Sequence, residues 1–166
     1  MLPKIKRILY ATDLSDNSRL AFGYAVAQAE QFGAQLMVVH VIEPVSAYTQ
    51  AHMSSLMGES EWMILQQDYN ERLYDTLQSQ LKQFCEQMST DMPTQCLQDD
   101  LIFVRKGLPV EEILSLADEK KADMIVLGTH GYGMLQDTIM GGTVRRVLRR
   151  SKQPVLIVRN PESIET

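Results

Sequence analysis

The sequence predicts an α/β protein built on a doubly wound parallel sheet, that is, a sheet covered by helices on both faces. Short apolar runs of strand length alternate along the chain with segments whose apolar residues recur at helical spacing, which gives the order β-α-β-α-β-α-β-α-β. One of these runs, residues 34–42, is apolar almost throughout, as is typical of a strand buried on both faces. The crossovers between parallel strands are expected to be right-handed.

The first two strands are expected at residues 5–12 and 34–42, with a helix between them. Residues 15–18 (Ser-Asp-Asn-Ser) are of the types that cap a helix start, and Gly33 is placed to end the helix. The apolar face of this helix is expected to consist of Ala21, Phe22, Ala25, Ala29 and Phe32.

A region without clear periodicity follows, and it is expected to be a variable loop over residues 43–60 that could contain a short helical piece. A long helix is expected from about Ser60. Its apolar residues lie three or four apart, which predicts one stripe that faces a core: Leu65, Tyr69, Leu73, Leu77, Leu81, Phe84 and Met88. The methionines Met53, Met57 and Met63 leave two interpretations open, a lid or interaction patch and ordinary packing.

The second half of the chain is expected to contain three more strands, at residues 101–104, 124–127 and 154–158. Pro109 fits the first turn of a helix, and Val110, Ile113, Leu114 and Ala117 would form its apolar face. Another helix is expected near residues 142–150. No linker divides the chain, so residues 1–166 are interpreted as a single domain.

Composition and charge exclude several classes of function. The chain has 16 Lys and Arg against 21 Asp and Glu, and its net charge of −5 disfavours general nucleic-acid binding. A basic run near the C-terminal end is instead interpreted as cations at the negative end of a helix: Arg145, Arg146, Arg149, Arg150 and Lys152. No apolar run reaches the roughly 18 residues of a membrane span, and the N-terminus lacks the pattern of a secretion signal.

The cysteines and histidines add no metal site and no catalytic residue. Cys85 and Cys96 lack the CxxC spacing and are expected to be reduced thiols of a cytoplasmic protein. His40, His52 and His130 lie too far apart for a zinc site. His40 is expected in the core, where it would be packed or hydrogen-bonded.

The chemistry is expected in a glycine-rich segment after the fourth strand. Five of the nine glycines fall between Gly128 and Gly142. In doubly wound sheets ligands bind at the carboxyl ends of strands, and backbone amides in such a loop and at the next helix start can cradle a phosphate. A tight turn that merely needs glycine is the alternative. The segment is neither a P-loop, since it lacks Gly-Lys-Ser/Thr, nor the GxGxxG motif of NAD-binding proteins.

The spacing Gly128-x2-Gly131-x9-Gly141-Gly142 resembles the nucleotide motif of the universal stress protein family. Five other segments resemble that family in their order along the chain: residues 8–15, 39–42, 107–113, 123–128 and 154–158. The similarity extends over residues 4–159. It implies a Rossmann-like, three-layer α/β/α fold whose five strands have the order 3-2-1-4-5.

The resemblance also implies a site for ATP, or for ADP or AMP, with any Mg²⁺ held by the phosphates. Asp13 and Val41 would hold the adenosine end, and the glycine segment would wrap the ribose and phosphates. The implied binding residues are Ala11, Thr12, Asp13, Val41, Leu127, Gly128, Thr129, His130, Gly131, Gly141, Gly142, Thr143 and Val144. A homodimer that pairs the last strands, from Pro154 to Arg159, is implied as well.

One residue departs from the family pattern, because Gly142 stands where the family has Ser or Thr. One neutral hydrogen bond to a phosphate, about 0.5–1.5 kcal/mol, would be missing unless Thr143 supplies it. The expected function is that of a nucleotide-binding regulatory protein of the stress response. Two alternatives remain open: a slow ATP hydrolase or nucleotidyl transferase, and a nucleotide-free dimeric interaction module.

Overall fold

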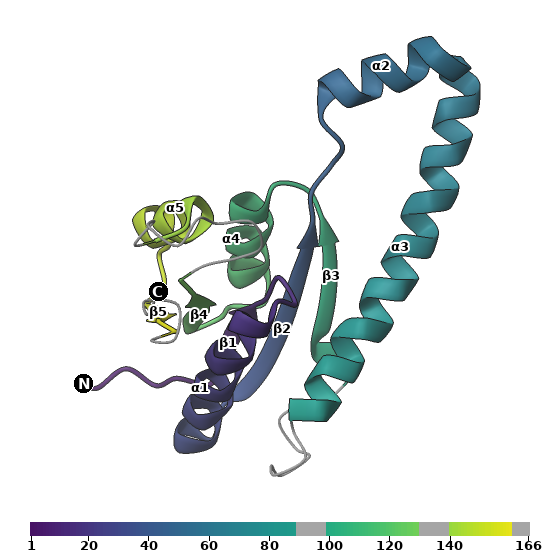
Figure 1. The fold of residues 1–166 in the computed structure, drawn as a ribbon. Helices are drawn as coiled ribbons and strands as arrows, with labels where there is room; N and C mark the ends of the chain where they lie inside the picture. Colours follow the sequence, from purple (N-terminus) through teal and green to yellow (C-terminus); the bar gives the residue numbers. More distant parts are fainter. Residues whose placement is uncertain (89–98, 130–139, 161–166) are drawn as a thin grey trace, which may run out of the picture.

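A computed structural model describes residues 1–88, 99–129 and 140–160 and shows a parallel sheet between two layers of helices (Figure 1). The strands are β1 (Arg7–Ala11), β2 (Gln35–Ile42), β3 (Ile102–Lys106), β4 (Met124–Gly128) and β5 (Val155–Val158). The helices are α1 (Asp16–Phe32), α2 (Ala47–Met57), α3 (Glu59–Met88), α4 (Pro109–Glu119) and α5 (Gly142–Arg150).

The sheet has five strands in the order β3-β2-β1-β4-β5, and every neighbouring pair is parallel. In the centre, Leu9 of β1 lies opposite Met37 of β2 on one side and Ile125 of β4 on the other. The predicted fold class and strand order are therefore confirmed. The strands β3 and β5 form the two edges of the sheet.

Each face of the sheet has its own hydrophobic core. On one face, Ile8, Tyr10 and Val38 pack with Phe22 of α1 and Leu81 of α3. The other face packs against α4 and α5, and its buried members include Leu9, Val39, Ile113, Leu116 and Val147. Because strand residues alternate between the two faces, neighbouring residues of β1 belong to different cores. The predicted Leu114 is partly buried against this core, and Leu116, which was not predicted, completes the buried face of α4.

The termini of α1 follow the sequence prediction only in part. Gly33 ends the helix in the left-handed conformation, at φ 60°, where a glycine carries no steric penalty. At the other end, the N-cap Ser15 makes no side-chain capping bond. Its hydroxyl donates instead to the carboxylate of Asp13, at 2.6 Å. The serine thus stabilises the loop after β1 rather than the first turn of α1.

The region expected as a variable loop contains the helical piece that this prediction allowed, but that piece is a helix of 11 residues, α2, which occupies most of the region. The hydroxyl of Ser46 caps it by accepting from the amide of Thr49, at 3.1 Å. None of its residues is buried, and so the sequence carries no amphipathic period that could reveal a helix. The described part of the second crossover contains two α-helices, where one long helix and at most a short helical piece were predicted.

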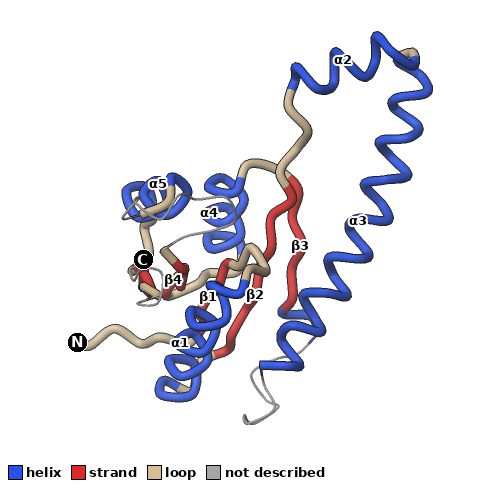
Figure 2. The backbone as a smooth tube through the Cα atoms, viewed as in Figure 1, coloured by secondary structure: helices blue, strands red, loops and turns tan. Residues whose placement is uncertain are grey.

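The helices α2 and α3 form a hairpin that extends beyond the sheet, with α2 at the top of the view and α3 running down its right side (Figures 1 and 2). We call residues 47–75 the arm. The predicted apolar stripe of α3 is buried only below the arm, where Leu81 is 0% exposed. In the arm, Leu65 and Tyr69 are exposed, at 49% and 59%. The expectation that the whole stripe faces a core was therefore wrong. None of the described helices has the length and apolar composition that a membrane span requires.

Candidate functional site

The carboxyl ends of β1, β2 and β4 and the start of α5 surround a cavity of about 510 Å³. In a parallel sheet these strand ends lie at one edge, and β1 and β4 are the neighbours between which the winding direction changes. This is the position at which α/β sheets place ligands, and the volume is within the roughly 300–1,000 Å³ of small-molecule pockets.

Eleven of the thirteen residues predicted for binding are described by the structure, and all eleven line this cavity. They are Ala11, Thr12, Asp13, Val41, Leu127, Gly128, Thr129, Gly141, Gly142, Thr143 and Val144. The other two, His130 and Gly131, lie outside the described residues. Segments more than 100 residues apart in the sequence thus meet at one cavity.

The loop after β1 is held by its own polar side chains. The Asp13 carboxylate accepts from the amide of Ser15 at 3.0 Å, and the Thr12 hydroxyl accepts from the amide of Leu14 at 3.0 Å. Leu14 has a φ of 64°, which is uncommon for a residue other than glycine. Such conformations persist where surrounding bonds enforce them, and they cluster at functional sites. The loop therefore places Asp13 at the cavity in a defined position.

The start of α5 faces the cavity with backbone groups. Its N-cap, Gly141, is extended and makes no side-chain cap bond, and its amide donates to the carbonyl of Thr129 at 2.9 Å. The amides of Gly142, Thr143 and Val144 belong to the first helical turn, which has no earlier carbonyls to bond. No other acceptor for them is found among the described residues. These amides, at the positive end of the helix, form a site suited to an anion.

Gly142, which stands where the family motif has Ser or Thr, has room for a side chain. A Cβ atom built on Gly142 would have its nearest contact at 3.8 Å, with the guanidinium of Arg146. Its φ is not positive, so the backbone accepts other residues. The missing hydroxyl is therefore a local difference of sequence and is not imposed by packing.

Two ion pairs connect α4 to α5 and to the turn that follows it. Arg150 donates to both carboxylate oxygens of Glu111, at 2.6 and 3.0 Å, and this hydrogen bonding lowers the pKa of Glu111 below its ordinary value. Lys152 donates to Asp118 at 2.8 Å, which likewise lowers the pKa of that carboxyl, with a further contribution from Gln153. The predicted role of these two cations at the helix end is thus refined, since each pairs with a named carboxylate of α4.

His40 lines the same cavity, although it was expected in the core. It lies near the carboxyl end of β2, and its Nδ1 is 2.8 Å from the carbonyl oxygen of Thr12. Because a carbonyl only accepts, Nδ1 carries the proton, and a neutral ring has Nε2 available as an acceptor. The prediction of a hydrogen bond is confirmed, but the ring is partly exposed. A polar residue in the last three positions of an apolar strand was the signal that could have placed it at the site.

Other lining residues were not found from the sequence. They come from α1, β2, the start of α4 and the lower part of α3: Ser18, Val39, Ile42, Glu43, Leu77, Pro109 and Ile113. Leu77 had been assigned to a core stripe, and it does lie on that stripe, where α3 forms a wall of the cavity. Pro109 follows Gly107, so the glycine-proline turn after β3 was the available signal for this part of the wall.

The charged side chains that line the cavity are negative. Asp13 and Glu43 line it, and no Lys or Arg does so among the described residues. The described residues also contain no group of three His, Cys, Asp or Glu side chains that could hold a metal ion. Any positive field for a bound phosphate would have to come from backbone amides and from a cation that the ligand itself carries.

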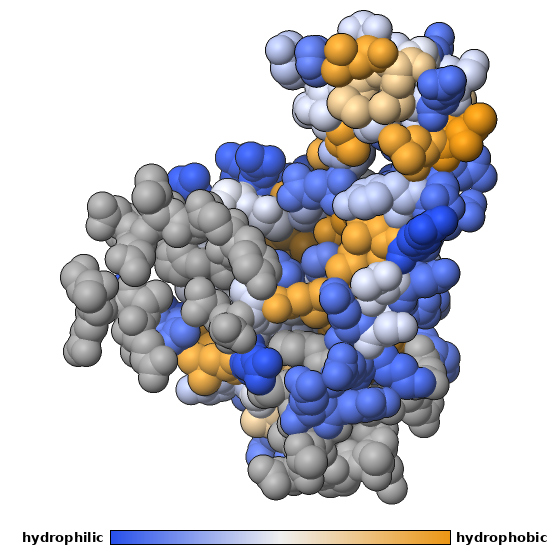
Figure 3. All heavy atoms as spheres, turned by 45° about the vertical axis from the view of Figure 1, so that its right-hand side comes forward, coloured by the Kyte–Doolittle hydropathy of each residue, from blue (hydrophilic) through white to orange (hydrophobic). Residues whose placement is uncertain are grey.

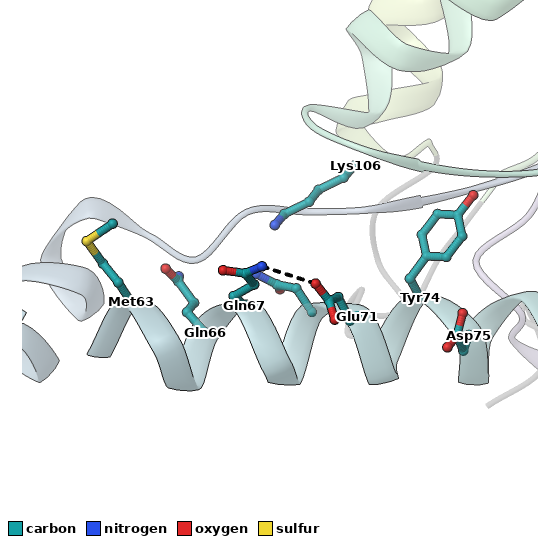
Figure 4. A pocket seen from close by; sticks show the side chains of 8 residues that line it. Met63, Gln66, Gln67, Glu71, Tyr74, Asp75 and Lys106 are labelled. Carbon is teal, nitrogen blue, oxygen red and sulfur yellow. Dashed lines mark hydrogen bonds between the residues drawn. The ribbon is translucent and has the colours of Figure 1, made fainter. Parts of the chain in front are cut away.

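A second hollow lies between α3 of the arm and the end of β3 (Figure 4). It has a volume of about 630 Å³, and Met63, Gln67 and Tyr74 extend from α3 toward the strand that carries Lys106. Gln67 donates to Glu71 at 3.2 Å along the same helix. This hollow shows which side of the arm faces the sheet, and that side combines amide and charged side chains with Met63 and Tyr74.

Comparisons with known proteins agree with the motif. The model of the universal stress protein family matches residues 4–159. A curated relative from Thermus aquaticus, described as a universal stress protein in the QAH/OAS sulfhydrylase 3' region, is 35% identical over 155 residues. That match covers 93% of this chain and 98% of the relative.

Solved structures show the same fold. Universal stress protein UspA from Lactobacillus plantarum has a TM-score of 0.69 at 21% identity, and the match covers 95% of this chain and 100% of that one. A universal stress protein solved in complex with cAMP has a TM-score of 0.61 at 25% identity, covering 95% of this chain and 98% of that one. One structural neighbour therefore holds an adenine nucleotide.

Proposed function

This chain belongs to the universal stress protein family, and we propose that it binds ATP, or the related nucleotides ADP and AMP, in the cavity at the carboxyl edge of its sheet. We propose that the bound nucleotide makes it a regulatory protein of the stress response in the cytoplasm. The observation that carries the proposal is the set of free amides at the start of α5, which face a cavity of about 510 Å³.

The cavity offers different chemistry at its two ends. The amides of Gly142, Thr143 and Val144 suit phosphate oxygens, because an N–H donates to an anion and the helix end is positive. The carboxylate of Asp13 suits the hydroxyl or amino donors of an adenosine, and Val41 offers apolar contact beside it. The structural neighbour solved with cAMP supports an adenine nucleotide as the ligand class.

A magnesium ion would be held mainly by the phosphates. The described residues provide no cluster of metal ligands, while a bound nucleotide supplies several phosphate oxygens of its own. The ion would offset the negative charge of Asp13 and Glu43 near the ligand.

The proposed action is recognition, and the bound nucleotide would favour one conformation or assembly to the extent that it binds that state more tightly. We also propose a homodimer through β5. The carbonyls of Pro154 and Val158 accept from the β4 side, so the alternate residues Val155 and Ile157 direct their backbone groups to the open edge. A second copy of this strand could pair there. Light scattering that gives a monomer mass at micromolar concentration would contradict the dimer.

The test of nucleotide binding uses Thr143→Glu with Thr143→Gln as its matched control. A carboxylate in the first turn of α5 is favourable to the helix and unfavourable to a phosphate at the same amides. We expect isothermal titration calorimetry to show ATP affinity lowered at least about thirtyfold by Glu, and changed by less than about threefold by Gln. Mass analysis of nucleotide released from the purified wild-type protein identifies the bound species.

Two results would contradict the proposal. One is equal ATP affinity in the Glu and Gln variants, since the phosphate would then lie elsewhere. The other is no binding of ATP, ADP or AMP by the wild type even at millimolar concentration, which would favour a nucleotide-free interaction module. Turnover of ATP above background that either variant abolishes would favour the hydrolase.

A further inference from the structure

The arm leaves apolar side chains uncovered in a pattern that normally packs against another helix. Leu65, Tyr69 and Leu73 follow one another at intervals of four residues on α3. Leu73 is partly buried, and Trp62, which precedes them on the same stripe, is buried. Leu65 and Tyr69 are 49% and 59% exposed. In Figure 3, hydrophobic side chains gather on the arm at the top of the molecule. An exposed stripe of this kind marks a contact surface.

This stripe is not the side of the arm that faces the sheet. The residues that line the hollow opposite Lys106 include Met63, Gln67 and Tyr74 (Figure 4). At about 100° per residue, these positions lie between about a third and a half of a turn from Leu65 and Tyr69 on the helix. Closing the arm onto its own sheet would therefore bury the side of α3 that lines the hollow and leave Leu65 and Tyr69 exposed.

The arm also carries most of the chain's net charge. Residues 47–75 contain five acidic residues, Arg72 and no other Lys or Arg, so they account for −4 of the total of −5. Arg72 pairs with Asp68 at 3.1 Å. Glu61 and Asp75 have no ion pair within the described part of the chain. Glu61 lies beside Leu65 around the helix, whereas Asp75 lines the hollow (Figure 4). The arm therefore carries an unpaired carboxylate beside the stripe and a net negative charge around it.

A complementary surface exists on α5. Arg145, Arg146 and Arg149 are exposed and have no ion pair among the residues the structure describes, in contrast to Arg150 with its partner Glu111. Leu148 lies among them on the outer face of the helix and is 47% exposed. This face joins one apolar side chain to three cations, the reverse of the arm in charge. Arginine is well suited to bind carboxylates at interfaces.

We propose that the arm of one copy of this protein docks on the outer face of α5 of a second copy. The apolar stripe would cover Leu148, and carboxylates of the acidic arm such as Glu61 would meet the unpaired arginines. Two arms packed against each other would bring like charges together, and a nucleic acid would be repelled by the arm. The contact differs from the proposed β5 pairing, so it would link β5-paired dimers into larger oligomers.

Sedimentation velocity over a concentration series tests this contact in the full chain. Measurements at about 50 mM and about 500 mM salt separate the two kinds of association, since salt screens charge pairs but not the hydrogen bonds of an edge strand. The variants are Glu61→Lys with Asp75→Lys, Arg145→Glu with Arg149→Glu, and all four changes combined. Glu30→Lys, an exposed position on α1, is the control for net charge.

We expect self-association of the wild type to weaken at high salt and each double reversal to weaken it about tenfold at low salt. The fourfold variant should recover most of the wild-type association, because its charges are again complementary. Replacing Leu65 and Tyr69 by serine should weaken association at both salt concentrations. Glu30→Lys should have little effect.

Three outcomes would overturn the proposal. Wild-type masses that do not depend on salt would show that no charged contact forms between copies. Failure of the fourfold variant to recover association, with its circular dichroism unchanged, would show that the arm and α5 do not meet each other. Stronger association after Glu61→Lys with Asp75→Lys alone would show that the arms pair with one another.

Discussion

Two regions of this molecule leave groups without partners, and they do so in opposite ways. At the start of α5, beside the cavity, the uncovered groups are backbone amides held by a rigid sheet. On the arm they are apolar side chains on a helix that extends away from the sheet. Three backbone donors at a fixed point suit a small anion, whereas a stripe of side chains suits another helix.

The difference shows how one fold could keep the two proposed functions apart. The cavity is built where strands end, so its geometry depends on the core beneath it. Among the described residues, α3 is anchored in the core below the arm, where Leu81 is buried. We therefore expect changes in the arm to alter association while the stability of the folded domain stays nearly constant.

The largest expected effect comes from comparing two leucines of the same helix. Leu81→Ala removes a side chain that is 0% exposed in the core on one face of the sheet. Denaturant unfolding should therefore show the free energy of unfolding lowered by about 2–5 kcal/mol. Leu65→Ala, 16 residues earlier on α3 and 49% exposed, should cost less than about 0.5 kcal/mol.

The difference in stability between these two variants depends on what covers the arm. Suppose that, at a concentration where the protein is monomeric, Leu65→Ala lowers the free energy of unfolding as much as Leu81→Ala does. The arm would then pack within its own chain. A loss for Leu65→Ala that appears only at high protein concentration would instead sharpen the contrast, because the stripe would then be buried between copies.

Much of the fold could be predicted because its signals are local. The buried run of β2, the helix-ending Gly33 and the proline that starts α4 each report their own surroundings. The helix α2 could not be predicted, since no residue of it is buried and nothing selects an amphipathic period. The stripe of α3 was read correctly as apolar, but a pattern does not say whether its partner belongs to the same chain.

The residues that line the cavity could be predicted only where the glycine motif and its resemblance to the family identify them. Backbone donors such as those of Thr143 and Val144 follow from the motif together with the helix start. His40 was not predicted at the cavity, because its place there depends on the loop after β1 and on the carbonyl of Thr12. Leu77 was not predicted there either, since only the tertiary fold brings α3 beside the strand ends.

A smaller effect is expected from restoring the family residue with Gly142→Ser. A hydroxyl there could donate to a phosphate, and the site has room for it, since the nearest atom to a Cβ lies at 3.8 Å. One neutral hydrogen bond of about 0.5–1.5 kcal/mol corresponds to roughly two- to tenfold tighter ATP binding by calorimetry. Gly142→Ala is the control, because it adds the Cβ without the hydroxyl.

Equal gains in Gly142→Ser and Gly142→Ala would assign the effect to a better-formed helix start instead of a phosphate contact. Loss of affinity in both would mean that the ligand approaches this backbone closely, so that even a Cβ obstructs it. Either result would leave the arm unaffected, and sedimentation of the nucleotide-free variants should match the wild type.

The smallest expected effect concerns how firmly α5 is held beside the cavity. Glu111→Gln breaks the ion pair with Arg150 that joins α4 to α5, whereas Asp68→Asn breaks the pair with Arg72 within the arm. Both pairs are exposed, so we expect small drops in melting temperature, and the drop should be larger for Glu111 because its pair joins two helices. Since the folded-state pKa of Glu111 is lowered, its contribution is present at neutral pH.

As the pH falls below about 4.3, the ordinary value for a glutamate, protonation begins to cancel that contribution. It is lost once the pH passes below the lowered folded-state pKa, so the melting temperatures of Glu111→Gln and the wild type should then converge. A difference that persists in acid would mean that Glu111 acts through packing and not through its charge. If Asp68→Asn instead had the larger effect at neutral pH, the arm would be more tightly integrated than its exposed side chains indicate, and the contrast between the two regions would fail.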